Sequence, residues 1–489
     1  MTPLALEDAV RSALERNLDL SIQRVQPLIG RQQIRQAIGA FDPLLELSAV
    51  YNHQERFVNS LLEQAAESGL IISNIFTPGG SLSGKLTTGT QYAFSLTAPS
   101  VSTNDPNRLF DQAYQAVMTL GLTQPLLRDF GTEVNLVQVR QAENVERQNL
   151  LAVEAKMLSL ILDVETRYWA LVYAQGHVDV SESAFALAQD LVVRTERQRR
   201  VGRATDLDVL QTRTAAEARR GELARARADL LNAQAQLRLL IDPKAAVGGP
   251  IVAGGRPRDE GSPVDLVGKL GTALARRPEI RQQELVIEKL ALSERLDKNN
   301  TLPRLDALGS LGWNGLAGNG LNQAFRGTLP SRLQGQDTYT DAFNNFLNPN
   351  GNVNWLLGLR LQFPIGNKVA LAQLEQTRLS RRQEELRLAL LKSQIAVDVE
   401  TAFNDLGAAA EQLQAARQAV SLASEQVDAE ERKLPAGLST VRTALETHNN
   451  LAIARDREVQ ALTTYASVRS RLDATQALPF ETYRLVVGR

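Results

Sequence analysis

The 489-residue sequence contains no cysteine and only three histidines. The absence of cysteine excludes a disulfide framework, a thiol nucleophile, a zinc–thiolate site and a lipid anchor on an N-terminal cysteine. His53, His177 and His448 stand far apart and show no metal-ligand spacing. The glycine pairs Gly79-Gly80 and Gly248-Gly249 lack the lysine and helix start that a phosphate-binding loop needs. We therefore predict a protein that is not an enzyme and that holds no metal or other cofactor.

Long hydrophobic runs and an excess charge are also missing. No stretch approaches twenty apolar residues, which excludes a membrane-spanning helix. No charged and apolar export signal precedes Leu4, so either the protein is cytosolic or a signal peptide absent from this chain has been removed. The net charge is −1, and the basic residues are interleaved with acidic ones instead of clustered. Nucleic acid is therefore not an expected partner.

Two long stretches with a seven-residue apolar repeat dominate the chain. The first extends from about Thr132 to Arg199 without a proline, and a helix of that length would be roughly 100 Å long. A seven-residue step is typical of a coiled coil. The apolar seams are Leu150, Met157, Val164, Leu171, Val178, Phe185 and Val192 in the first stretch, and Val399, Leu406, Leu413, Val420, Val427 and Leu434 in the second. Seams this long are expected to need partner helices from other copies of the chain.

The chain contains the same order of elements twice: a helix, strands, a long helix, a glycine-containing tip and a return helix. The first repeat is predicted at 1–242, with its first helix at 4–38, strands at about 44–124, the long helix at about 132–200 and the tip at 201–205. A linker is predicted at 243–263. The second repeat is predicted at 264–477, with strands at about 304–363, the long helix at about 369–433 and the tip at 435–440, and a tail follows at 478–489. In the strand regions, Thr77-Pro78-Gly79-Gly80 predicts a turn, and the glycine- and asparagine-rich 314–352 predicts a loop.

The clearest strand extends from Val353 to Phe363 and alternates strictly. Its apolar face is Val353, Trp355, Leu357, Leu359, Leu361 and Phe363. The opposite face includes Gly358, Arg360 and Gln362. One apolar face is typical of half of a soluble sheet, but no amphipathic helix of matching size is predicted to cover this one. Aromatic residues near the strand ends are typical of membrane barrels. We therefore predict that the apolar face contacts lipid.

Several local sequences together resemble one family. These are Leu4-Ala5-Leu6-Glu7-Asp8-Ala9-Val10 with Asn17, the break at Phe41-Asp42-Pro43, the strand exit at Gln124-Pro125-Leu126-Leu127, and the Gly-x-x-Thr sequences at both tips. Their order and duplication resemble the TolC-like outer-membrane efflux and secretion channels.

The resemblance implies an α+β membrane protein of the outer membrane that extends into the periplasm. It implies a homotrimer whose protomers share a twelve-stranded β-barrel, continuous with a long α-helical coiled-coil barrel. The implied partners are outer-membrane lipid, a periplasmic adaptor protein and an inner-membrane pump. The first strand region is about twenty residues longer than the second, so the extra strand near Tyr92 is expected either outside the barrel or as an addition to it.

The same resemblance suggests a periplasmic gate at the tips. Asp208 matches a carboxylate of the closing latch, and Glu446 matches an acidic position at the entrance. The latch aromatic and arginine of the family fall at Leu434 and Ser439, and another acidic ring position falls at Thr443, so Arg203 and Arg442 are the available substitute cations. Carboxylates beside a helix start are equally expected to be solvated or to stabilise the helix N-terminus. The adaptor-contacting residues are expected to be Val201, Gly202, Arg203, Ala436, Gly437 and Leu438.

Two function classes remain open at this point. The first is a passive exit duct of a tripartite efflux pump or a type I secretion system, which exports small molecules or proteins. The second is a coiled-coil scaffold or adaptor of the cell envelope, which has no need for barrel strands.

Overall fold

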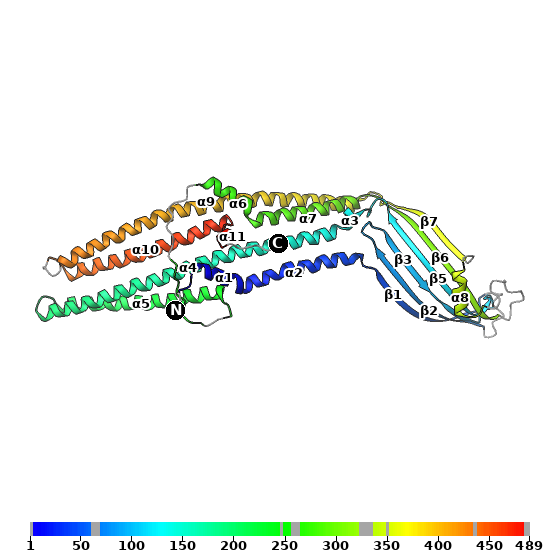
Figure 1. Ribbon diagram of the computed structural model, residues 1–489, viewed down its shortest axis with the longest axis horizontal. Coiled ribbons are helices and arrows are strands. Elements are labelled where there is room, and N and C mark those ends of the chain that lie inside the picture. The colour runs from blue at the N-terminus through cyan, green and yellow to red at the C-terminus, as the bar shows by residue number, and fades with distance from the viewer. Residues whose placement is uncertain are drawn as a thin grey trace. The chain divides into compact units, whose positions relative to one another are not determined.

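The computed structural model describes residues 3–59, 69–244, 248–255, 265–321, 336–348, 352–433 and 438–483. The chain forms two compact units, and each takes segments from both halves of the sequence (Figure 1). We call Met1–Ile29, Glu146–Val286 and Glu384–Arg489 the helical unit, and Gly30–Val145 and Ile287–Gln383 the sheet unit. The compact units are therefore not the two sequence repeats.

Helices make up most of the chain. Those of the first half are α1 (Leu6–Arg16), α2 (Leu18–Ile38), the short 3-10 helix η1 (Gly39–Phe41), α3 (Thr132–Asn135), α4 (Val137–Arg200) and α5 (Asp206–Ile241). Those of the second half are α6 (Leu266–Arg276), α7 (Pro278–Asn300), α8 (Tyr339–Leu347), α9 (Lys368–Lys433), α10 (Val441–Thr475) and α11 (Pro479–Thr482).

The single helix predicted over 4–38 is in fact two helices, α1 and α2, which Asn17 separates. Asn17 has an extended backbone, with φ −63° and ψ 129°. Its side-chain oxygen accepts a hydrogen bond from the Leu20 amide at 3.0 Å, which caps the start of α2. A similar interruption at Arg277 separates α6 from α7. An asparagine that binds its own backbone competes with the helix, and the apolar period alone does not reveal this.

The strands form one antiparallel sheet. They are β1 (Leu44–Phe57), β2 (Leu70–Lys85), β3 (Gln91–Thr97), β4 (Ser100–Thr103), β5 (Phe110–Pro125), β6 (Arg304–Leu321) and β7 (Asn352–Gln362). The order across the sheet is β1-β2-β3-β5-β6-β7, and β4 pairs with β2 and β5. Because β3 and β4 both lie between β2 and β5, they fill one position, so the described residues supply six strand positions. A twelve-stranded trimer would need four.

The predicted turn at Thr77-Pro78-Gly79-Gly80 is wrong, because these residues lie inside β2. Pro78 has no amide hydrogen to donate, and it falls where β2 changes partner. Residues 73–76 of β2 pair with β4, and residues 79–85 pair with β3. The Pro78 carbonyl still accepts from the Ala98 amide at 2.9 Å. A proline is tolerated at such an irregularity of a sheet.

The predicted loop at 314–352 is also partly wrong. β6 continues to Leu321, and α8 begins at Tyr339 with a Thr338–Asp341 capping box. Ala342 and Phe346 of α8 pack on Ala116 of β5 and Ala317 of β6. At Gly315 a Cβ atom would collide with the Ala342 carbonyl, so glycine is needed for this close approach.

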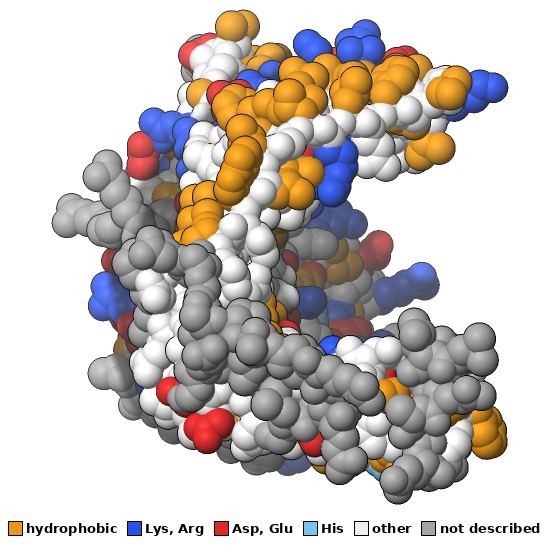
Figure 2. Space-filling model, turned by 90° about the vertical axis from the view of Figure 1, so that its right-hand side faces the viewer, with side chains coloured by type: hydrophobic (Ala, Val, Ile, Leu, Met, Phe, Trp, Pro, Cys, Tyr) orange, Lys and Arg blue, Asp and Glu red, His pale blue; other side chains and the backbone are white. Residues whose placement is uncertain are grey.

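All six strand positions present one apolar face in register. Cross-strand partners point to the same side of a sheet, and the partner chain Leu45↔Leu82↔Phe94↔Leu120↔Leu311↔Trp355 crosses it from edge to edge. Figure 2 shows hydrophobic side chains gathered along the upper edge of the sheet end, where Figure 1 places β7.

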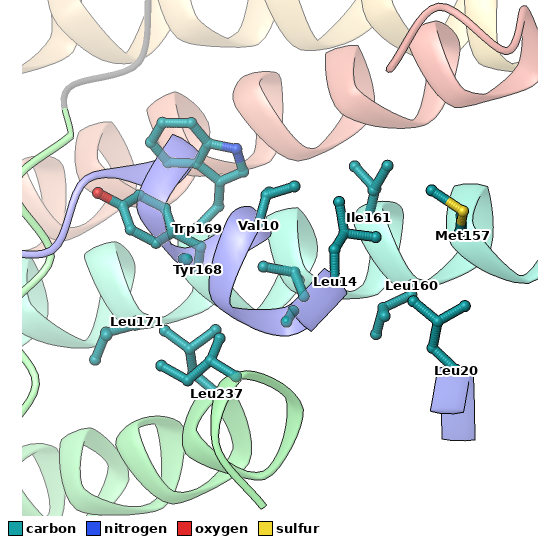
Figure 3. Packing of buried hydrophobic residues seen from close by; sticks show 14 of the residues in the cluster. Val10, Leu14, Leu20, Met157, Leu160, Ile161, Tyr168, Trp169, Leu171 and Leu237 are labelled. Carbon is teal, nitrogen blue, oxygen red and sulfur yellow. The ribbon is translucent and has the colours of Figure 1, made fainter. Parts of the chain in front are cut away.

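The helical unit contains its own hydrophobic core, in which α1 and α5 pack on α4 (Figure 3). Val164 and Leu171 of the predicted seam are fully buried there, beside Val10 and Leu237. The seam of α9 is buried in the same way, with Leu406 and Leu413 packed against Tyr465 and Leu472 of α10. The expectation that these seams need other copies of the chain is therefore wrong for most of their length.

Other helix surfaces of the helical unit carry exposed apolar residues. They include Leu18, Ile22, Val25 and Ile29 of α2, and Leu386, Leu390 and Val397 of α9. The four α2 positions are spaced by four, three and four residues, which is the spacing of a coiled-coil seam.

Candidate functional site

The first tip joins α4 to α5 through a tight glycine-dependent turn. Gly202 has φ +74°, in the left-handed region that favours glycine. The Gly202 amide donates to the Arg199 carbonyl at 2.9 Å, and the Arg203 amide donates to the Gln198 carbonyl at 2.8 Å. These two bonds form a Schellman motif, which satisfies carbonyl groups at the end of α4. Arg199 also forms a 2.6 Å ion pair with Asp206, across the tip.

Asp208 is the third residue of α5 and stabilises the start of its own helix. Its carboxylate accepts from the Thr205 amide at 2.8 Å and from the Thr205 hydroxyl at 2.7 Å. Thr205 Oγ1 in turn accepts from the Asp208 amide at 3.1 Å, which completes a capping box. The hydrogen bonds from Thr205 lower the pKa of the Asp208 carboxyl. In the described residues neither Arg203 nor Arg442 forms an ion pair with Asp208.

The second tip has the same spacing in the part that the structure describes. The Leu438 amide donates to the Lys433 carbonyl at 3.1 Å, five residues back, as Arg203 does to Gln198. Thr440 caps α10 by accepting from the Thr443 amide at 3.2 Å. Thr443 therefore occupies the position of Asp208 without its charge. Ala436 and Gly437, predicted to belong to this tip, lie outside the described residues, as does Leu434, predicted as the position of the latch aromatic.

Glu446 and Arg442 lie near the start of α10, and both side chains are exposed. They line a groove of about 450 Å³ between α10 and the α4–α5 hairpin. Arg219 of α5 and Asn449 of α10 are hydrogen-bonded along this groove. Glu446 and Arg442 thus share a surface that both hairpins build, whereas Asp208 does not line it.

Sequence reasoning missed a smaller polar hollow of about 70 Å³ where α4 approaches α9 and α10. Thr195 lines it from α4, Glu430 and Glu431 from α9, and His448 from α10. His448 lies 3.6 Å from Glu431, and the Ser439 hydroxyl donates to Glu430. An isolated histidine carries no spacing signal, so only the folded hairpins bring these groups together.

The strand predicted to face lipid is β7, one edge of the sheet. Trp355, Leu357 and Leu359 of its apolar face are 75%, 80% and 73% exposed. Val353, Leu361 and Phe363 are also exposed. The other edge strand, β1, is exposed along its whole length. Both edges therefore present unpaired backbone groups beside bare apolar side chains.

Two features are absent from the described part of the chain. There, no helix is both long and apolar enough to cross a membrane. Among the same residues, no cluster of three or more histidine or acidic side chains could hold a metal ion.

The comparison with known protein families identifies the chain. The model of the outer membrane efflux protein family matches residues 9–241 and 270–476. The chain belongs to the outer membrane efflux protein family. This confirms the resemblance to TolC-like channels that the sequence suggested. The family is one of transport channels and not of enzymes.

Solved structures of outer membrane channels share the fold of this family member. The CmeC outer membrane channel of Campylobacter jejuni is 15% identical, with a TM-score of 0.66, and the match covers 96% of this chain and 85% of CmeC. VceC from Vibrio cholerae is 15% identical, with a TM-score of 0.65, and the match covers 96% of each chain. The open state of the MtrE channel of Neisseria gonorrhoeae is 15% identical, with a TM-score of 0.63, and the match covers 96% of this chain and 88% of MtrE. No curated protein sequence matches this family member.

Proposed function

We propose that three copies of this chain form a passive exit duct of the outer membrane. The duct would serve a tripartite efflux pump or a type I secretion system and carry small molecules or proteins across the periplasm and outer membrane. The observation that carries the proposal is the sheet, whose apolar face continues in register across six strand positions, and whose two edge strands are exposed. The short helix α8 covers part of that face at Ala116 and Ala317 and leaves β7 exposed.

The bare edges support assembly by strand pairing. A long exposed edge beside apolar side chains is an aggregation hazard unless another strand covers it. Closing the sheet into a barrel removes every edge and satisfies each backbone group inside lipid. The edge strands of 14 and 11 residues are long enough to cross the hydrocarbon layer, because a tilted spanning strand needs about 9–11 residues.

The exposed helix seams support the same assembly in the helical unit. Ile22 of α2 is 64% exposed, and Leu386 of α9 is 57% exposed. Burying such a side chain contributes about 1.5–3 kcal/mol. The natural cover is a second copy of the chain, with α2 of one protomer beside α9 of the next in a closed ring.

The tips are the proposed docking and closing end of the duct. An adaptor protein would contact Val201, Gly202, Arg203 and Leu438, which are exposed, together with Ala436 and Gly437. Glu446 would occur three times around the axis as a negative ring. Because Asp208 already caps α5, its part in closing would be indirect: it holds the tip in shape while Arg203 and Arg442 remain available to a neighbouring protomer.

The scaffold alternative explains the coiled-coil helices but not the sheet. A scaffold has no use for six strands with one apolar face. No observation in the described residues favours it over the duct.

The proposal is tested by purifying the protein in detergent and inserting it into a planar lipid bilayer. We expect trimers that resist heat in detergent and discrete single-channel conductance steps. Addition of a cognate adaptor should raise the open fraction. A detergent-free, soluble monomer without conductance would contradict the duct and favour the scaffold.

A further inference from the structure

We propose that the β2–β3 hairpin is part of the membrane wall, so that three chains close an eighteen-stranded barrel instead of a twelve-stranded one. This inference rests on the proposed trimeric duct and specifies the width of its outer-membrane pore. The partner at each sheet edge is a second copy of this chain, with β7 of one protomer paired to β1 of the next.

The hairpin is inserted between the other strands and is not attached beside them. β2 pairs with every residue of β1, from Leu44↔Ser83 to Phe57↔Leu70. On its other side β2 pairs with β3 and β4, and these pair with β5. β1 has no partner other than β2 in the described sheet. Removing the hairpin from the wall would therefore break both of its ladders.

The side chains of the hairpin follow the lipid and water faces of the neighbouring strands. On the apolar side, Leu82 pairs with Leu45 and Phe94, and the Tyr92 ring lies over Gly84. Where β2 pairs with β3, the opposite side is polar and nearly uncharged: Gly79, Ser81, Ser83 and Lys85 on β2, and Gln91, Ala93, Ser95 and Thr97 on β3. Farther along β2 the same side carries the apolar Ile71 and Ile75. A hairpin outside the membrane would not need this alternation to continue in register.

The turn of the hairpin is fixed to the segment that follows β5. The Gly131 amide donates to the Thr88 carbonyl at 3.0 Å, and the Thr90 hydroxyl bonds Gln124 at 2.5 Å. Gly89 is buried with φ +96°, and a Cβ atom there would collide with the Asp129 carbonyl. The hairpin is therefore held at the end of the sheet where the chain enters α3.

Six strand positions also allow the ring to close. Neighbouring strands in the order β1-β2-β3-β5-β6-β7 are all antiparallel, so β1 and β7 point in opposite directions. β7 can then pair antiparallel with β1 of the next copy. Three chains would give eighteen strands, a number at which barrels enclose an aqueous channel.

The consequence is a wider pore. Barrel diameter grows roughly linearly with strand number, so eighteen strands give a diameter about 1.5 times that of twelve and a cross-section about 2.2 times as large. The added wall lines the pore with hydroxyl and amide groups. The duct would thus admit bulky hydrophilic solutes or polypeptides that a twelve-stranded mouth excludes.

Single cysteines test the placement directly, because the natural chain has none. In membranes that contain the full trimer, we would label Ser83→Cys and Leu82→Cys with a water-soluble, membrane-impermeant maleimide. We expect the maleimide to label the cysteine at position 83 and not the cysteine at position 82. Labelling at both positions, or at neither, would overturn the inference.

A matched pair on β7 separates this failure from a failure of the proposed duct. Arg360→Cys should be labelled and Leu359→Cys should not. If β7 alternates and the hairpin does not, the duct stands and the eighteen-stranded barrel falls. If β7 does not alternate either, the membrane barrel itself is wrong.

Polymer exclusion tests the width. Neutral polymers of graded size are added on the side of the bilayer where the barrel opens, away from the helices, while single-channel conductance is recorded. Replacing residues 58–109 by a short loop joins Phe57 to Phe110 and leaves four strands in each chain. We expect the largest polymer that enters to fall by about one third in diameter. An unchanged limit would show that the hairpin does not contribute to the wall.

Discussion

Gly202 and Gly221 offer a clean test of how the first tip is built. At both positions an added Cβ atom would meet no other atom within 4 Å, so steric crowding plays no part. Gly202 has φ +74°, whereas Gly221 lies within α5 and is exposed. Replacing each by alanine therefore isolates the backbone conformation as the only difference.

The expected effects have opposite signs. A non-glycine residue in the left-handed region costs about 1–2 kcal/mol. Gly202→Ala should therefore weaken the two hydrogen bonds that end α4. Glycine in the middle of a helix costs about 0.5–1 kcal/mol relative to alanine. Gly221→Ala should therefore stabilise α5 by that amount.

Hydrogen exchange of the tip amides measures both changes. The amides of Gly202 and residue 203 donate the two Schellman hydrogen bonds. Because 1.4 kcal/mol corresponds to a factor of ten, the amide hydrogens at positions 202 and 203 should exchange about 5- to 30-fold faster in Gly202→Ala than in the natural chain. Amides around position 221 should exchange about 2- to 5-fold more slowly in Gly221→Ala. Equal protection of the tip in Gly202→Ala and the natural chain would refute the account of the tip.

Three further predictions concern assembly, packing and pH. Ile22→Gln should lower the trimer yield in detergent without loss of helicity, because Ile22 belongs to the exposed apolar seam of α2. Arg24→Gln, on the other side of α2, should leave the trimer yield unchanged. Equal yields for the two variants would contradict the α2 interface. Gly315→Ala should detach α8 from the sheet and make it sensitive to protease. Gly309→Ala, on the same face of β6, has room for the added methyl group and should leave α8 protected. Greater protease sensitivity in Gly309→Ala than in Gly315→Ala would refute this packing. Burial raises the pKa of the Glu165 carboxyl, so this carboxyl stays protonated to higher pH in the folded chain than in the unfolded chain. The free energy of unfolding should therefore fall as the pH rises from the pKa of Glu165 in the unfolded chain to its pKa in the folded chain. Glu165→Gln should flatten that dependence in thermal melts, and an unchanged slope would exclude Glu165 as its source.

The long helices could be predicted from sequence because their signals are local. Proline-free stretches, a seven-residue apolar step and a glycine after the last turn define α4 without any knowledge of its neighbours. The partners of the seams could not be predicted in the same way. Val164 and Leu406 look like interface positions in sequence, yet α1, α5 and α10 of the same chain bury them.

Strand β2 was missed for a different reason. Thr77-Pro78-Gly79-Gly80 has turn composition, and only the pairing of β2 with three other strands makes a proline tolerable there. The preceding Ile71-Ile72-Ser73-Asn74-Ile75-Phe76 is rich in β-branched and apolar residues and could have indicated a strand. α8 was missed because its helix is short and is stabilised by contacts with the sheet.

The tip residues show the limit of reasoning from resemblance. Asp208 matches a latch carboxylate by alignment, but its hydrogen bonds here are those of a capping box with Thr205. The Thr-x-x-Asp spacing at 205–208 is typical of a capping box and could have indicated this role from the sequence. Gating by Asp208, Glu446, Arg203 and Arg442 stays a proposal.

Exchanging residues on the two faces of β7 tests whether the apolar face of the sheet contacts lipid. Leu359 lies on the apolar face and Arg360 on the opposite one. We expect Leu359→Arg to destabilise the barrel by about 2–4 kcal/mol if the site is near the bilayer midplane. Arg360→Leu should form heat-resistant trimers as the natural chain does. If trimers of both variants resist detergent and heat equally, the sheet is not a membrane wall.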